Sequence, residues 1–299
     1  MPYTSRASST DQLSLSGFTR ELHNRFVPII FKTVIEKNAW HGFPCRMPKA
    51  LLKDIVNHGD RTLRINTIAD YDGALNGLQV ENDGKISRIA AAVDASLATV
   101  RKAAAQKADL LLVHHGLFWN PQQPWVGKKR ELIGALVENN MAVYSAHLPL
   151  DLHPRLGNNI GLCRALKFIK PKPFFKEHDQ HIGLKVNARL GRDILANRLK
   201  TILGSPPGLL KGGPSVCRKV GIVTGGAGSS ITKAAEEGVD TFITGEGPHW
   251  TGALAEELEI NVFYGGHYAT ETFGVKSLAA HLSKKYRLPW KFVDHPTGL

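Results

Sequence analysis

The chain has 299 residues, of which 42% are apolar, 21% charged and 8% aromatic. This profile is typical of a globular protein and excludes a chain that is disordered or fibrous as a whole. The longest apolar stretches fall far short of the roughly 18 residues that a membrane-spanning helix needs, so we expect a soluble protein with no membrane partner. The three cysteines, Cys45, Cys163 and Cys217, lack CxxC spacing, which favours a reducing compartment such as the cytoplasm.

The net charge of +12 arises from 38 Lys and Arg against 26 Asp and Glu. A strongly basic chain is compatible with nucleic-acid binding. The basic residues are spread along the chain in short runs such as Lys128–Arg130, however, and no motif of a nucleic-acid-binding module accompanies them. We therefore interpret the charge as a solvated surface that attracts phosphorylated small molecules, and nucleic acid is not an expected partner.

Residues 1–46 differ from the rest of the sequence. Their first twenty residues are rich in Ser and Thr and show neither alternating nor helical apolar spacing, so they have no means of building a core. We predict a disordered or non-native N-terminal extension. A Ser-rich start with few acidic residues is also found in organelle targeting segments, and this alternative stays open.

From residue 86 onward, short apolar runs suited to strands alternate with segments of helical apolar spacing. This order predicts an α/β fold with parallel strands. The predicted strands cover residues 89–93, 109–113 and 142–146, with helices at 97–106 and 130–138. Residues 220–223, 231–237 and 241–244 then repeat the order strand, helix, strand.

The second of these regions resembles the first when the chain is shifted by 131 positions without a gap. The aligned pairs include Ile89 with Val220, Asp109 with Asp240, Gly116 with Gly247 and His115 with Glu246. We predict two similar α/β domains related by an internal duplication, at 47–165 and 166–299, with the end of the chain packing back on the first. Chance similarity between two Ala-rich helices is the alternative.

Two sequence motifs offer metal ligands. VHHGLFW, at 113–119, places His114 and His115 at the end of an apolar strand, where open α/β folds build their sites. GGHYATETFG, at 265–274, places His267 and Glu271 four residues apart, on one face of a helix. Either motif alone is also compatible with a structural histidine or a surface His/Glu pair. Together they favour a metal site of imidazole and carboxylate ligands.

These motifs, with HLPLD at 147–151, TGEGPHW at 244–250 and AVDAS at 92–96, resemble the Nif-three-like dinuclear metal centre proteins, often labelled GTP cyclohydrolase type 2. The resemblance covers residues 47–299. It implies a dimetal site in the cleft between the two α/β domains, and a ring-shaped homohexamer. By that resemblance the metal ligands are His114, His115, Asp151, His267 and Glu271, and Glu246 and His249 lie in a loop near the metals.

Imidazole and carboxylate ligands without thiolate suit two divalent ions of zinc, iron, manganese or cobalt. Two such ions lower the pKa of a shared water molecule and so generate a hydroxide nucleophile, with Glu246 or His249 as the candidate general acid or base. We therefore predict a metal-dependent hydrolase that acts on a nucleotide or another phosphorylated small molecule, similar to GTP cyclohydrolase type 2. The alternative is a non-enzymatic metal-binding scaffold or regulatory partner.

Overall fold

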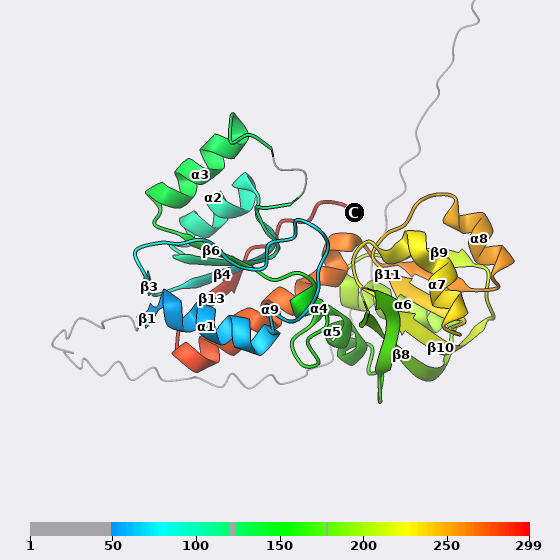
Figure 1. Cartoon of the computed structure of the whole chain (residues 1–299). Coiled ribbons are helices and arrows are strands. Elements are labelled where there is room, and N and C mark those ends of the chain that lie inside the picture. The colour runs from blue at the N-terminus through cyan, green and yellow to red at the C-terminus, as the bar shows by residue number, and fades with distance from the viewer. Residues whose placement is uncertain (1–48, 120–122, 178) are drawn as a thin grey trace, which may run out of the picture. The chain divides into compact units, whose positions relative to one another are not determined.

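The computed structural model describes residues 49–119, 123–177 and 179–299 (Figure 1). The predicted N-terminal extension at residues 1–46 lies outside the described residues. Two main β-sheets and the helices that cover them make up the described part of the chain.

The first sheet has five strands in the order β13-β4-β5-β6-β2. All neighbours are parallel except β2, which pairs antiparallel with β6. A separate two-stranded ribbon joins β1 to β3. The strands are β1 (Ala50–Leu51), β2 (Gly77–Val80), β3 (Lys85–Ile86), β4 (Ile89–Asp94), β5 (Leu110–His115), β6 (Ala142–Ser145) and β13 (Trp290–Phe292).

Helices cover both faces of this sheet, α2 and α3 on one and α1 and α9 on the other (Figure 1). In β5, Leu111 and Val113 face α2 and α3, whereas Leu110 and Leu112 face α1 and α9. A strand buried on both faces needs apolar residues at every position, which explains its unbroken apolar run. The helices are α1 (Leu52–Leu63), α2 (Leu97–Ala105), α3 (Lys128–Glu138) and α9 (His267–Tyr286).

The second sheet has six strands in the order β7-β8-β10-β11-β12-β9. Its centre, β10-β11-β12, is parallel, and the outer strands pair antiparallel. Both main sheets are therefore mixed, whereas the sequence predicted only parallel strands. The strands are β7 (Lys172–Glu177), β8 (Gln180–Gly191), β9 (Gly208–Lys211), β10 (Val216–Ile222), β11 (Thr241–Thr244) and β12 (Asn261–Tyr264).

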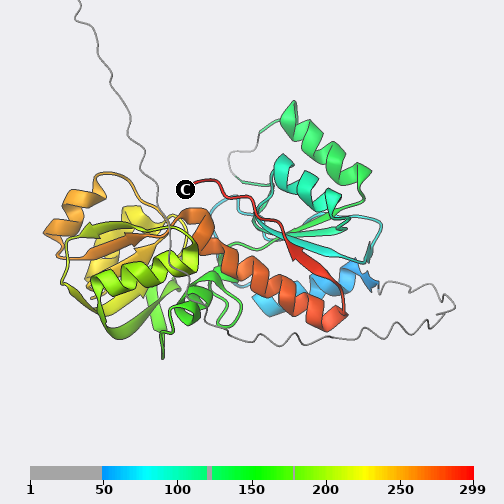
Figure 2. The same ribbon diagram turned by 180° about the vertical axis from the view of Figure 1, so that it is seen from behind.

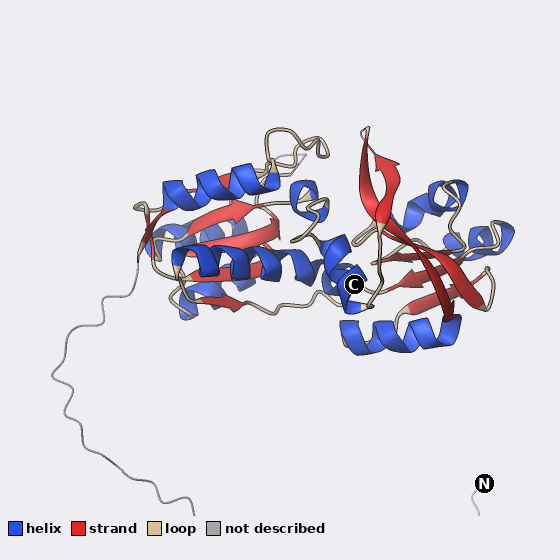
Figure 3. Cartoon of the chain, turned by 90° about the horizontal axis from the view of Figure 1, so that it is seen from below, coloured by secondary structure: helices blue, strands red, loops and turns tan. Residues whose placement is uncertain are grey.

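The second sheet also carries helices on both faces, α5 and α6 on one and α7 and α8 on the other (Figure 3). A short helix, α4, links β6 to α5, and a 3-10 turn precedes α7. The helices are α4 (Leu148–Asp151), α5 (Asn158–Ala165), α6 (Arg192–Leu203), η1 (Ala227–Ser230), α7 (Ile231–Glu236) and α8 (Thr251–Glu257).

The end of the chain returns to the first sheet. Helix α9 follows β12 of the second sheet, and its residues Val275, Leu278 and Leu282 are buried against the first (Figure 2). Strand β13 then pairs in parallel with β4. Helix α9 thus begins beside the second sheet and continues into the core of the first.

In two of the parallel pairs, β4–β5 and β10–β11, an aspartate holds the start of the pair in the same way. The Asp109 carboxylate accepts hydrogen bonds of 2.8–3.0 Å from the backbone N–H groups of residues 87 and 88. The Asp240 carboxylate accepts bonds of 3.0–3.1 Å from those of residues 218 and 219. The predicted α/β class is confirmed, and among the described residues no helix is both long and apolar enough to cross a membrane.

Candidate metal centre

Acidic and imidazole side chains gather where several elements begin or end. Strand β5 ends in two of them, helix α4 supplies one at its start and one at its end, and helix α9 supplies two from its first turn and the next. The carboxyl ends of parallel strands meet at one edge of a sheet, so the fold concentrates these groups there. We refer to them as the His–carboxylate cluster, which consists of His114, His115, His147, Asp151, His267 and Glu271.

Glu271 lies between three of the imidazoles. Its Oε1 atom is 3.5 Å from Nε2 of His114. Its Oε2 atom is 3.3 Å from Nε2 of His115 and 3.1 Å from Nε2 of His267. One carboxylate therefore presents its two oxygens to different histidines, as a bridging ligand would.

The second carboxylate of the cluster belongs to Asp151, at the end of helix α4, which follows β6. Oδ2 of Asp151 is 3.4 Å from Nε2 of His114, and Oδ1 accepts a 2.7 Å hydrogen bond from the Asn158 side chain. The rings of His114 and His147 are 4.9 Å apart between centroids. The Asn158 bond fixes the Asp151 carboxylate while leaving its second oxygen directed at the cluster.

The ligand atoms form two overlapping groups. One contains His114, His115 and His147, and the other contains His115, His267 and Glu271; within each group all ligand atoms lie within 4.8 Å of one another. His115 belongs to both. A neutral imidazole has one lone pair, so His115 could bind only one of two neighbouring cations.

The two histidines of β5 are oriented through their Nδ1 atoms. His114 Nδ1–H donates a 2.9 Å hydrogen bond to the carbonyl oxygen of Ala146, and His115 Nδ1–H donates a 2.8 Å bond to the Asp94 carboxylate. A carbonyl only accepts, so in its neutral form His114 carries its proton on Nδ1 and a lone pair on Nε2. Both Nε2 atoms are then available as ligands.

The remaining two histidines are held in the same way. His147 Nδ1–H donates to Asp70 at 2.8 Å, and His267 Nδ1–H donates to Glu246 at 2.8 Å. Metal-binding histidines are commonly oriented by a carboxylate or carbonyl on their second nitrogen. All four imidazoles of the cluster show this arrangement.

Two buried atoms of the cluster have no hydrogen-bond partner among the described residues, Nε2 of His114 and Oε2 of Glu271. His114 is 0% exposed and Glu271 3% exposed. Leaving a buried polar atom unpaired costs about 1–3 kcal/mol, more for a charged group. A cation between these two atoms would satisfy both, so the residues present fit a divalent metal ion.

The charges within the cluster reinforce one another. Burial opposes protonation of His114 and His267, but the neighbouring carboxylates outweigh it; they hold the pKa of His114 well above its ordinary value and raise the pKa of His267 to about 9. Burial also opposes ionisation of Glu271, yet the imidazoles, His114 first, hold its pKa well below the ordinary value. The carboxylates thus create a site that favours positive charge.

All five predicted ligands lie in the cluster, and Glu246 adjoins it through His267. His249 is exposed, and no side-chain hydrogen bond or ion pair is described for it. Sequence reasoning missed His147 as a ligand candidate, although it directly follows β6 in the same motif as Asp151. It also missed the orienting carboxylates Asp70 and Asp94.

A cavity of about 190 Å³ opens onto the cluster. His115 and His267 line it together with residues of the β4 end, of α9 and of the chain's last residues, namely Val93, Asp94, Tyr268, Thr297 and Leu299. The cluster is therefore reachable from outside.

Residues 50–297 match the family model described as Duf34/NIF3 (NGG1p interacting factor 3). The chain belongs to the Duf34/NIF3 family. The family resemblance seen in the sequence motifs is therefore confirmed.

Individual members of the Duf34/NIF3 family align over most of the chain. A protein of Deinococcus radiodurans named GTP cyclohydrolase 1 type 2 homolog is 40% identical over 230 residues, which are 76% of this chain and 88% of that protein. A protein of the same name from Haemophilus influenzae is 39% identical over 81% of this chain and 96% of its own length. The crystal structure of TTHA1606 from Thermus thermophilus is similar with a TM-score of 0.77 and 38% identity, covering 84% of this chain and 100% of that one.

Proposed function

We propose that the His–carboxylate cluster binds two divalent metal ions, of zinc, iron, manganese or cobalt. The observation that carries this proposal is the convergence of four imidazole rings, each anchored through Nδ1, with the Glu271 carboxylate facing three of them. His114, His147 and Asp151 would hold one ion, and His115, His267 and Glu271 the other, with Glu271 facing both groups. Two bound ions would supply Lewis acidity and lower the pKa of a water molecule.

The same proposal extends to activity: a metal-dependent hydrolase for a nucleotide or another phosphorylated small molecule, in the manner of GTP cyclohydrolase type 2. The cavity beside His115 and His267 supports it, because a small molecule could reach the cluster there. Glu246 and His249 are the candidate acid and base. The hydrogen bond from His267 gives Glu246 a positioning role as well.

We also propose that the protein is cytoplasmic and that it assembles as a homohexamer. We further propose that the two α/β domains, 47–165 and 166–299, arose by internal duplication. The duplication is supported by equivalent registers: β4 pairs with β5 as Ile89 with Leu110, and β10 pairs with β11 as Val220 with Thr241. Both pairs match under the 131-residue shift, and so do the bonds to Asp109 and Asp240.

The test begins with elemental analysis of purified protein, for which about two metal ions per chain are expected. Nucleotides and phosphoesters are then screened for hydrolysis with each candidate metal, and the variant His114→Ala/His115→Ala serves as the control lacking the site. Hydrolysis that depends on metal and is lost in that variant supports the enzyme. Two bound ions without turnover of any substrate would support the scaffold instead, and no bound metal would refute both.

A further inference from the structure

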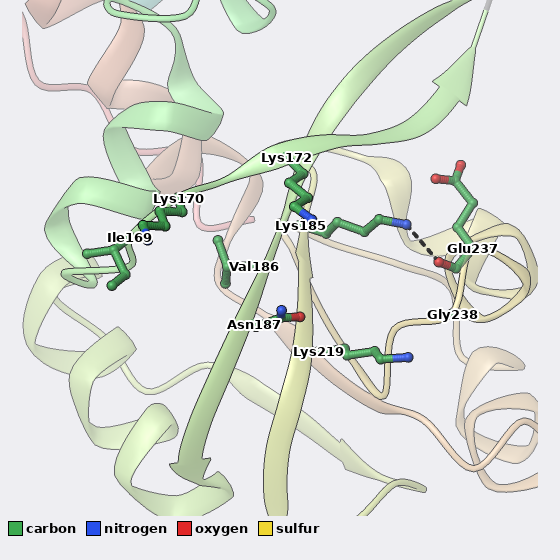
Figure 4. Close-up of a pocket in the computed structure, with 9 residues that line it drawn as sticks. All are labelled: Ile169, Lys170, Lys172, Lys185, Val186, Asn187, Lys219, Glu237 and Gly238. Carbon is green, nitrogen blue, oxygen red and sulfur yellow. Dashed lines mark hydrogen bonds between the residues drawn. The ribbon is translucent and has the colours of Figure 1, made fainter.

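A second cavity, of about 490 Å³, lies on the second sheet, away from the His–carboxylate cluster (Figure 4). No residue lines both cavities. The second cavity adjoins Lys219, the residue directly before β10 starts its parallel pairing with β11. His267 of the cluster, by contrast, follows the carboxyl end of β12. We call it the lysine cavity, after its four basic residues, Lys170, Lys172, Lys185 and Lys219.

Strand register brings three of these lysines, Lys172, Lys185 and Lys219, together. Lys172 on β7 pairs directly with Lys185 on β8. Lys219 on β10 pairs with Asn187, two residues further along β8 and so on the same face as Lys185. Like charges opposite each other on neighbouring strands are destabilising, so this arrangement is unfavourable unless an anion accompanies it.

The lining residues include only one carboxylate, that of Glu237, and it is already engaged. Its oxygens accept hydrogen bonds of 2.9 and 2.8 Å from the backbone N–H groups of Phe175 and Lys176. Lys185 Nζ donates instead to the backbone carbonyl of Glu237, at 3.0 Å (Figure 4). Within the described ranges, none of the four lysines forms an ion pair with a carboxylate.

The side chains of Lys185 and Lys219 extend in the same direction, toward the end of α7 (Figure 4). A lysine ammonium group is a compact charge on a flexible side chain, and it binds phosphate oxygens without the fixed bidentate geometry of an arginine. The cavity volume of about 490 Å³ lies within the range of small-molecule sites. A water molecule occupies roughly 30 Å³, so the cavity has room for far more than a single phosphate. None of the described residues that line the cavity is aromatic, so they offer no surface on which a nucleic-acid base would stack.

We propose that the lysine cavity binds a small anion that carries several linked phosphate groups. Binding there is independent of the metal centre, because the two sites share no residue. A small polyphosphate offsets the repulsion among the lysines without needing the base contacts of a nucleic acid.

The test is a calorimetric titration with inorganic tripolyphosphate at physiological ionic strength. Wild-type protein should bind it at one saturable site, and Lys172→Gln/Lys219→Gln should weaken binding by at least about tenfold, since two charge-assisted contacts are lost. The matched control Lys53→Gln/Lys284→Gln removes the same charge from exposed helix positions and should change affinity by less than about twofold. Circular dichroism confirms that each variant is folded.

A second variant, His114→Ala/His115→Ala, separates this site from the metal centre, because tripolyphosphate also chelates metals. Binding should persist in that variant, and it should be retained even if the protein proves to hold no metal at all. Absence of saturable binding, an equal loss in the lysine control, or loss in the histidine variant would each overturn the proposal. So would tighter binding of a short single-stranded oligothymidylate that is abolished by Lys172→Gln/Lys219→Gln, since the ligand would then be a nucleic-acid backbone.

Discussion

Replacing Asp94 with alanine tests whether orientation of His115 controls metal binding. The Asp94 carboxylate accepts one described hydrogen bond, the 2.8 Å bond from His115 Nδ1, and His115 belongs to both candidate metal groups. Removing such an orienting partner typically weakens metal affinity 10–100-fold, or about 1.4–2.8 kcal/mol. The Asp94 side chain is 32% exposed, which screens the bond and places the expected loss in the lower half of that range.

The assay is a competition titration with a chromophoric chelator, using zinc and manganese. Because this is the one hydrogen bond described for the Asp94 side chain, the free energy of unfolding of the metal-free protein should change by less than about 1 kcal/mol in Asp94→Ala. Asp72→Ala, an exposed aspartate without a described side-chain partner, is the matched control and should bind metal normally. Unchanged affinity in Asp94→Ala, or an equal loss in both variants, would refute the orienting role.

Three further outcomes are expected. The double variant His114→Ala/His115→Ala should lose at least one metal ion by elemental analysis while keeping its circular dichroism spectrum; unchanged metal content would contradict the ligand assignment. Glu246→Gln should retain metal and lower turnover by roughly 10²–10⁴-fold if Glu246 is the base, whereas loss of metal would show that it acts only by orienting its histidine. The Nε2 atoms of His58 and His281 are 2.8 Å apart, and burial lowers the folded-state pKa of both histidines. Their contribution to stability is therefore present above their unfolded pKa of about 6.5, and it is lost as the pH falls through their folded-state pKa values. His281→Gln should therefore flatten the loss of the urea midpoint between about pH 7.5 and pH 5.5, and an unchanged slope would be evidence against this pair.

The sequence predicted the parts of the cluster that depend on local periodicity. The apolar run of β5 ends at adjacent histidines, and the i,i+4 spacing of His267 and Glu271 sets them on one helical face. Both signals arise within a single element, so a pattern of a few residues contains them. They were enough to place His114 and His115 at a sheet edge.

Contacts between distant segments could not be predicted in the same way. Asp70 reaches His147 from 77 positions away, in a loop without a regular element. The sequence led us to expect the end of the chain on the first domain but not the pairing of β13 with β4, and the antiparallel β7–β8 pair has no counterpart in the predicted strand and helix order. These features depend on contacts between distant segments of the folded chain, which local spacing does not encode.

The site's buried charges are tolerated because the elements that position them are stabilised elsewhere. Helix α9 contributes His267 and Glu271 from its first two turns, but Val275, Leu278 and Leu282 lie further along in the apolar core. Burying each such side chain contributes about 1.5–3 kcal/mol, so the three together offset the cost of about 1–3 kcal/mol for leaving a buried atom of the cluster unpaired. The fold can therefore hold Nε2 and Oε2 atoms at the sheet edge without a hydrogen-bond partner. What those atoms lose in folding is available for binding a cation, and this preorganisation supports the proposal that the cluster is a metal centre.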